Sequence, residues 1–152
     1  MPEIVTLTMN PAIDTSTEVD TVASEIKMRC DPPQRDPGGG GINVSRAIKK
    51  IGGNSTAIFT AGGGMGDLLR DLLVAEGITL HPVAIAAMTR DNMTIYERNS
   101  GLQYRFGMPG APVTAVEQAD CVDAVLEMKA DYVVASGSLP RVASLKSPES
   151  LN

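Results

Sequence analysis

Four consecutive glycines at positions 38–41 limit how this 152-residue chain can fold and indicate what it can bind. A glycine run leaves the backbone free to adopt positive φ angles and to lie directly against a ligand. A helical pattern follows at once, with Asn43 in its first turn. The N–H groups at a helix start and the positive end of the helix dipole attract oxyanions and hydroxyl groups. The run therefore predicts a ligand-binding loop, and a plain tight turn between two elements is the alternative.

The residues around the glycine run do not fit two common nucleotide-binding loops. A dinucleotide-binding fingerprint needs a strand leading into the glycines and an acidic residue closing the next strand, and neither is present here. A Walker A loop is also excluded, because no Gly-Lys-Ser/Thr follows the glycines. The preceding segment, residues 31–37, holds three prolines and is predicted to be a linker.

Composition narrows the class of protein. The length suits one domain with a real core, which must be aliphatic because the chain has no Trp and only three Tyr and two Phe. A net charge of −5 argues against binding to nucleic acid or to an anionic membrane. Cys30 and Cys121 lie far apart and the chain has one His, which argues against a metal site and favours free thiols. Without a leader pattern or a long apolar span, a cytoplasmic protein is expected.

Alternating strand and helix patterns predict an α/β fold with a mostly parallel sheet. Apolar and β-branched runs predict strands at residues 3–9, 55–61, 78–85 and 131–135. Amphipathic periodicity and glycine stops predict helices at residues 44–51, 65–76 and 114–128. The last helix begins with a capping box, Thr114-x-x-Glu117.

Two polar segments do not fit the main sheet. Residues 15–30 are predicted to form two exposed strands, because apolar residues alternate loosely with polar ones. Residues 92–98 and 103–106 are predicted to form a hairpin around Asn99-Ser100-Gly101. We expect the two segments, at about 15–36 and 90–107, to form a small second sheet laid beside the main one as a lid.

Three loops are expected to gather where the parallel strands end, since ligands of open parallel sheets bind beyond the carboxyl ends of the strands. They are the loop that carries Asp14, the glycine run, and Ser136-Gly137-Ser138. The Asp14 carboxylate can accept hydrogen bonds from paired sugar hydroxyls, and a turn-capping role is the alternative. The hydroxyls and N–H groups of the serine loop suit a phosphate, and an ordinary turn after a strand is the alternative.

Cations cluster on the predicted lid of this acidic chain. They are Lys27, Arg29, Arg90, Arg98 and Arg105. Arginine suits phosphate because its planar fork can donate two charge-assisted hydrogen bonds. Lysine and arginine also protect strand edges from aggregation, which is the alternative for each of these residues.

Taken together, these motifs resemble the PfkB, or ribokinase-like, family of carbohydrate kinases. Residues 8–14 resemble the opening of its sugar-phosphate kinase branch, and residues 39–45 fit its first signature, with Gly52 and Gly62 downstream. Further segments match in order and spacing: Thr89-Arg90, Gln103–Phe106, Met108–Gly110 and Ser136–Pro140. The resemblance covers residues 1–140 and implies a three-layer ribokinase-like fold with a small β lid.

The resemblance also implies an activity. Two features favour fructose 6-phosphate as the substrate over fructose 1-phosphate or tagatose 6-phosphate: the unbroken glycine run and Lys27-Met28-Arg29-Cys30. The product would be fructose 1,6-bisphosphate, as in glycolysis. The sugar 1-hydroxyl would attack the γ-phosphate of Mg-ATP in line. The resemblance assigns the sugar hydroxyls to Asp14, the backbone of Gly38, Gly39, Gly40 and Gly41, and Asn43. It assigns the existing phosphate to Arg90, Ser138 and Lys27, with Arg29 and Arg105 as further candidates.

Family members commonly dimerise through their lids, so a homodimer is expected in which Lys27 or Arg29 serves the neighbouring subunit. The family chain is about twice this long, and its second half holds the catalytic Asp of a Gly-Ala-Gly-Asp stretch and the nucleotide pocket. Nothing in residues 141–152 resembles either feature, which predicts a non-family tail, as at the end of a truncated or out-of-frame gene. We therefore expect this chain to be the substrate-binding half of a kinase, without kinase activity alone and with an uncovered sheet edge. The alternative is a non-catalytic module that binds a phosphosugar or pairs through its lid.

Overall fold

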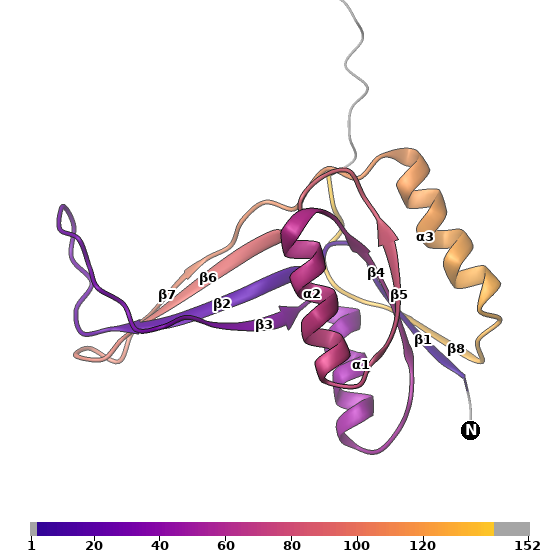
Figure 1. Ribbon diagram of the computed structural model, residues 1–152, viewed down its shortest axis with the longest axis horizontal. Coiled ribbons are helices and arrows are strands. Elements are labelled where there is room, and N and C mark those ends of the chain that lie inside the picture. Colours follow the sequence, from indigo (N-terminus) through magenta and orange to yellow (C-terminus); the bar gives the residue numbers. More distant parts are fainter. Residues whose placement is uncertain (1–2, 142–152) are drawn as a thin grey trace, which may run out of the picture.

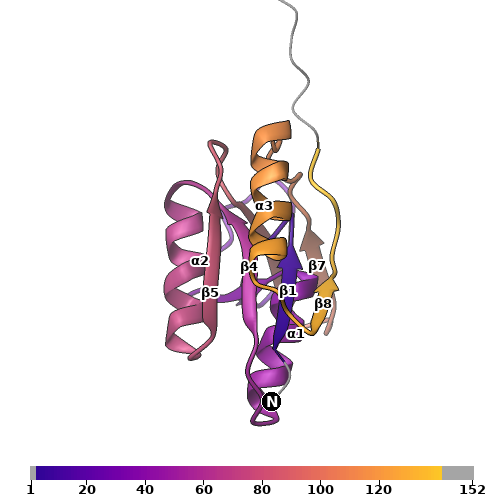
Figure 2. The ribbon, with the colours of Figure 1, turned by 90° about the vertical axis from the view of Figure 1, so that its right-hand side faces the viewer.

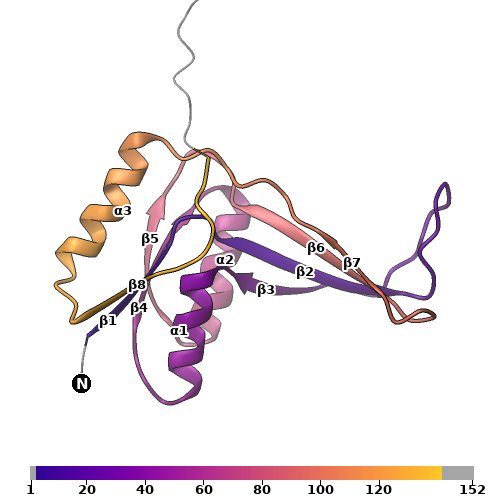
Figure 3. The same cartoon turned by 180° about the vertical axis from the view of Figure 1, so that it is seen from behind.

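The structure is a computed structural model that describes residues 3–141. It consists of a larger α/β body and a smaller sheet, which projects to one side of the body in Figure 1 and is seen from behind in Figure 3. We call this smaller sheet, with the loops that join its strands, the lid. The predicted tail lies outside the described residues except for Arg141.

The body is built on a parallel sheet with the strand order β5-β4-β1-β8. Every pairing within it is parallel. Its strands are β1 (Ile4–Thr8), β4 (Thr56–Ala61), β5 (Thr79–Ala84) and β8 (Tyr132–Ala135). The predicted α/β class and the predicted strands of the main sheet are therefore confirmed.

Helices cover both faces of this sheet. They are α1 (Gly40–Lys50), α2 (Gly63–Ala75) and α3 (Ala115–Glu127). Consecutive residues of β4 point to opposite faces, so Phe59 packs in one cluster with Leu69 of α2, whereas Ile58 packs with Cys121 of α3. Figure 2 looks onto the α3 face. The result is the expected three-layer arrangement. No helix in the described part of the chain has the length and hydrophobicity needed to span a membrane.

The lid is a mixed sheet with the order β3-β2-β6-β7. Its strands are β2 (Ala12–Val19), β3 (Gln34–Gly38), β6 (Arg90–Glu97) and β7 (Gln103–Phe106). β6 and β7 form the predicted hairpin, and β6 also pairs in parallel with β2. The lid sheet therefore comprises residues 12–38 and 90–106 of the chain.

The prediction of two strands within residues 15–30 is wrong. One strand ends at Val19, and the second lies in residues 34–38, inside the segment predicted to be a linker. β3 pairs antiparallel with β2, from Ala12↔Gly38 to Ser16↔Gln34. This long-range pairing outweighs the local proline signal, because β3 is an edge strand and edge strands tolerate proline.

The loop between β2 and β3 lies at the far end of the lid (Figure 1) and is held there by charged groups. Arg98 donates from Nη1 to Asp31 Oδ2 over 2.6 Å and from Nε to Asp20 Oδ1 over 2.8 Å. Buried Glu97 accepts from the Val22 amide over 2.7 Å. These hydrogen bonds hold both ends of the loop that carries Lys27. They also give Arg98 a structural role, so no ligand is needed to explain an arginine at this position.

Apolar side chains remain uncovered on one side of the body. β8 is an outer strand of its sheet, and Tyr132 and Val133 are 63% and 49% exposed. On the neighbouring helix α3, Val116 and Leu126 are 70% and 68% exposed. The expected uncovered sheet edge and helix face are therefore present in the described part of the chain.

Candidate functional site

The glycine run, the end of β1 and the serine loop meet at the carboxyl ends of β1 and β8. The Gly41 amide donates to Ser136 O over 3.1 Å, and the Ser136 amide donates to Leu7 O over 3.2 Å. A Cβ atom on Gly40 would lie 2.6 Å from the Gly137 nitrogen. The structure therefore brings the glycine run and the serine loop together at this edge. The third expected loop is a strand instead, because Asp14 lies within β2 and pairs with Asp36 of β3.

Contacts with the protein itself account for much of the glycine run. Gly39 has a φ of +130°, which L side chains rarely adopt, and a Cβ on Gly38 would overlap the Asp14 carboxylate. The Ile42 amide donates to Thr8 Oγ1 over 2.9 Å, and the Gly41 amide is taken by Ser136. These two N–H groups fix the start of α1 and are not free to donate to a ligand in this conformation.

Asp14 lies on β2 close to the body, and its side chain is exposed. Its neighbour in register on β6 is Asn92, whose Nδ2 donates to Asp14 Oδ1 over 3.1 Å. Asn92 Oδ1 in turn accepts from the Met108 amide over 3.0 Å. Asn92 therefore orients the carboxylate, a role that sequence reasoning missed because only the strand register places these two residues side by side.

A hollow of about 270 Å³ on the lid sheet brings a carboxylate and a guanidinium into one space. It is lined by Asp14, Asn92, Met93, Thr94, Arg105, Phe106 and Gly107. Arg105 is exposed and lies opposite Thr94 in the β6–β7 ladder. A ligand with hydroxyl groups for the carboxylate and an anionic group for the guanidinium matches this lining.

Arg90 is held at the junction of lid and body. Its guanidinium donates to the carbonyl oxygens of Asn10, Met108 and Pro11 over 3.1, 3.3 and 3.4 Å. The Asn10 and Pro11 carbonyls lie in the link between β1 and β2, and the Met108 carbonyl lies in the segment after β7. Both segments connect the body with the lid, and we call them crossings. Arg90 therefore joins the two crossings. A guanidinium has more N–H groups than these bonds use, and Arg90 can therefore still donate to an anion.

Ser138 lies in the exposed loop after β8, and its Oγ accepts from Asn10 Nδ2 over 2.9 Å. Asn10 thus contacts both predicted phosphate ligands, Arg90 through its carbonyl and Ser138 through its side chain. The structure brings these two residues to one place. Asn43 is exposed in the first turn of α1, close in sequence to the glycine loop.

Lys27 and Arg29 are not brought to this place within one chain. Both are exposed in the loop between β2 and β3, at the far end of the lid (Figure 1). β2 continues five residues beyond Asp14 to Val19, which is about 16 Å of extended chain. Within this chain the two cations therefore lie away from Asp14, Arg90 and Ser138.

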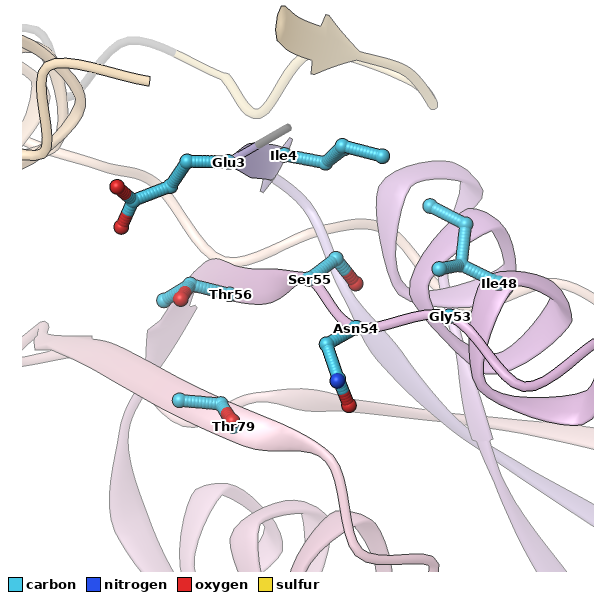
Figure 4. A pocket seen from close by; sticks show the side chains of 8 residues that line it. All are labelled: Glu3, Ile4, Ile48, Gly53, Asn54, Ser55, Thr56 and Thr79. Atoms are coloured by element: carbon cyan, nitrogen blue, oxygen red, sulfur yellow. The ribbon is translucent and has the colours of Figure 1, made fainter. Parts of the chain in front are cut away.

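Another hollow, of about 330 Å³, lies at the opposite end of the main sheet (Figure 4). It is lined by Glu3, Ile4, Ile48, Gly53, Asn54, Ser55, Thr56 and Thr79. The Ser55 hydroxyl there already donates to Ser45 Oγ over 2.9 Å. This hollow is at the amino ends of the strands, whereas ligands of parallel sheets bind at the carboxyl ends, so we do not assign the site to it.

The chain is similar to curated proteins over most of its own length. The chain is 50% identical over 141 residues to the ATP-dependent 6-phosphofructokinase isozyme 2 of Mycobacterium tuberculosis strain H37Rv, covering 91% of this chain and 42% of that protein. It is 44% identical to the enzyme of the same name from Escherichia coli K12, covering 92% and 46%. The chain thus spans less than half the length of these relatives.

Solved structures show the same likeness. The crystal structure of phosphofructokinase-2 from Escherichia coli in complex with fructose-6-phosphate matches with a TM-score of 0.87 and 44% identity, over 92% of this chain and 46% of that one. A candidate ribokinase from Agrobacterium tumefaciens, at 17% identity and a TM-score of 0.60 over 72% of this chain and 36% of that one, shares the fold alone.

The sequence motifs, the three-layer fold with its lid and the loops at the carboxyl ends of β1 and β8 lead to the same family. The model of the pfkB family of carbohydrate kinases matches residues 3–151, which is nearly the whole chain. The chain therefore belongs to the pfkB family of carbohydrate kinases.

Proposed function

We propose that this chain is the hexose-phosphate-binding half of an ATP-dependent sugar-phosphate kinase, with fructose 6-phosphate as the substrate. The observation that carries the proposal is the hollow that Asp14 and Arg105 line together. Relatives at 44–50% identity are named ATP-dependent 6-phosphofructokinase isozyme 2, which supports this substrate. Relatives named 1-phosphofructokinase and D-tagatose-1-phosphate kinase are more distant, at 27–30% identity.

In this proposal the chain binds and orients the sugar phosphate. The Asp14 carboxylate, held by Asn92, accepts hydrogen bonds from sugar hydroxyls near the backbone of Gly38, Gly39 and Gly40. The Asn43 side chain can accept hydrogen bonds from these hydroxyls and donate to them. Arg90, Ser138 and Arg105 bind the existing phosphate, because guanidinium and hydroxyl groups donate charge-assisted hydrogen bonds to phosphate oxygens. Fixed donors of this kind place the acceptor hydroxyl, and positioning is a large part of catalysis in phosphoryl transfer.

The family implies Mg-ATP, which supplies the transferred phosphoryl group when it is bound. Within residues 3–141 no cluster of three or more His, Cys, Asp or Glu side chains could hold a metal ion. The residues gathered at the site suit a sugar phosphate, and we assign none of them to the nucleotide. A catalytic base and a nucleotide pocket would come from the part of the fold that the relatives possess beyond the span of this chain. Activity in the cytoplasm, where ATP and sugar phosphates meet, is part of the proposal.

We also propose a homodimer joined through the lids, in which Lys27 and Arg29 approach the partner's sugar site. Both cations lie exposed at the end of the lid, away from Asp14 of their own chain. The hydrogen bonds of Arg98 and Glu97 hold the loop that carries them. An exposed cationic loop that is held at both ends could reach the sugar site of the partner, so that each subunit adds cations to the other's anion site.

Calorimetric titration of the chain with fructose 6-phosphate tests the proposed function. We expect saturable binding that Asp14→Asn weakens at least tenfold, because the amide cannot replace both acceptor oxygens. Asp71→Asn, on the exposed face of α2, changes the charge equally and should leave the affinity within twofold. A chain that does not bind fructose 6-phosphate contradicts the proposal. Binding without ATP-dependent conversion favours the non-catalytic binding module over an active kinase.

A further inference from the structure

We propose that Asn10 is a positioning residue for the phosphate end of the substrate. Its side-chain amide makes the Ser138 hydroxyl available as a donor, and its carbonyl fixes the Arg90 guanidinium beside it. The inference rests on the proposed function, since it concerns the phosphate that Arg90 and Ser138 would bind. Asn10 itself is given no contact with the substrate.

The geometry places Asn10 between the two phosphate ligands. It is only 9% exposed, in the short link between β1 and β2, and the following Pro11 restricts its backbone to extended conformations. Its Nδ2 donates to Ser138 Oγ over 2.9 Å, and its carbonyl oxygen accepts from Arg90 Nη2 over 3.1 Å. One nearly buried residue thus links the serine loop after β8 with the junction of lid and body.

The direction of the Asn10–Ser138 hydrogen bond decides what Ser138 can do. A serine hydroxyl has one proton to donate and lone pairs to accept with. Because the Asn10 amide donates, Ser138 Oγ is the acceptor, and its own proton stays available for a phosphate oxygen. Ser138 is exposed, so that proton can point into solvent or toward a ligand. An acceptor at position 10 would instead draw the proton away from the ligand.

Gly110 leaves room for the Asn10 side chain in this orientation. A Cβ atom at position 110 would overlap Asn10 Oδ1, and the other two of its nearest atoms also belong to the Asn10 amide group. The segment that follows β7 therefore packs directly against the amide. Gly110→Ala should displace Asn10 without altering any group that would touch the substrate, which gives a second route to the same test.

The charge arrangement makes a nearly isosteric substitution informative. Asn10→Asp keeps the shape of the side chain but turns the donor into an acceptor and adds a negative charge between Ser138 and Arg90. A carboxylate at this place attracts the hydroxyl proton and the guanidinium, and it repels an incoming phosphate. Loss of phosphate affinity should therefore be larger for Asn10→Asp than for Asn10→Ala.

Calorimetric titrations with fructose 6-phosphate and with inorganic phosphate test the inference. We expect Asn10→Asp to weaken both at least tenfold and Asn10→Ala to weaken them two- to fivefold. Asn54→Asp, an equal charge change on an exposed residue at the opposite end of the body, should stay within twofold for both ligands. Thermal unfolding of each variant shows whether it folds, and Gly110→Ala replaces Asn10→Asp if the latter does not.

A double-mutant cycle separates positioning from general damage to the fold. If Asn10 acts through the Ser138 hydroxyl, Asn10→Ala should lose most of its effect on phosphate affinity in a Ser138→Ala background. Additive losses overturn the inference, as does an Asn10→Asp variant that binds fructose 6-phosphate within twofold of the unmodified chain. If the unmodified chain binds neither ligand, the proposed function itself fails, and the inference fails with it.

Discussion

Arg90 has a structural role at the junction of lid and body, and its guanidinium keeps donors to spare. Its guanidinium donates to carbonyl oxygens in two crossings between body and lid, and those bonds leave some of its N–H groups unused. An arginine that is already held in place loses little conformational freedom when an anion binds. The residue therefore has a structural reason to be arginine that is independent of the substrate.

Arg90→Lys should lower the free energy of unfolding by about 1–2 kcal/mol, because one ammonium group cannot reproduce a fork that reaches three carbonyls. Urea unfolding followed by circular dichroism measures this change. Arg70→Lys is the matched control, since Arg70 is exposed and forms a surface ion pair with Asp67 over 3.5 Å. The control should change stability by less than about 0.5 kcal/mol. Equal changes in the two variants would show that Arg90 does not join the crossings.

At the scale of elements, Glu117 anchors α3 in two directions. Its carboxylate accepts from the Thr114 amide and from the Ala86 amide, each over 2.7 Å, while the Glu117 amide donates to Thr114 Oγ1 over 3.2 Å. The hydrogen bond from the Thr114 amide, and after it the one from the Ala86 amide, lower the pKa of the Glu117 carboxyl below its usual range. The capping box that starts the helix thus also fastens it to the segment after β5.

Glu117→Ala should cost about 1 kcal/mol of stability at pH 7. A carboxyl group with a lowered pKa in the folded state stabilises above its usual pKa, and this contribution is lost as the pH falls through the lowered value. The difference between wild type and variant should therefore shrink as the pH is lowered from 5 toward 3. Urea midpoints across this range measure it. Glu127→Ala, exposed at the other end of α3, should show no such trend.

For the whole molecule, the exposed apolar surface on β8 and α3 predicts self-association. Sedimentation velocity should show oligomers that Val133→Lys disrupts, because a charge on an edge strand opposes pairing. Ile26→Lys, in the loop at the end of the lid, distinguishes the proposed lid dimer from this contact. If only Ile26→Lys dissociates the oligomer, the lid is the interface. A monodisperse monomer before any substitution contradicts both contacts.

Local patterns in the sequence were enough to predict the elements whose own residues determine them. Leu69 and Leu73 recur at helical spacing and are fully buried in α2, and Thr114 with Glu117 forms the predicted capping box. Asn99-Ser100-Gly101 joins the two strands of the predicted hairpin. In each case the signal and the structure lie within a few residues of each other.

Features that depend on distant partners could not be predicted in the same way. The helix expected from Val44 begins at Gly40, because Thr8 Oγ1 and Ser136 O accept from its first amides. β3 exists because β2 pairs with it, although its own residues suggested a linker. Asn10 and Asn92 are ordinary polar residues in the sequence, and only the loop contacts and the strand register place them beside Ser138 and Asp14.

The four outer strands formed by the described residues are not equally protected. β3, β5 and β7 each contain a proline or an arginine, whereas β8 reads Tyr-Val-Val-Ala. Among the described residues, β8 is therefore the outer strand most open to pairing with a second chain. When two copies pair along β8 about a two-fold axis, the outer edge of β8 is covered in both copies. No β8 edge then remains for a third copy. Where chains associate through β8 alone, association should accordingly end at a symmetric pair.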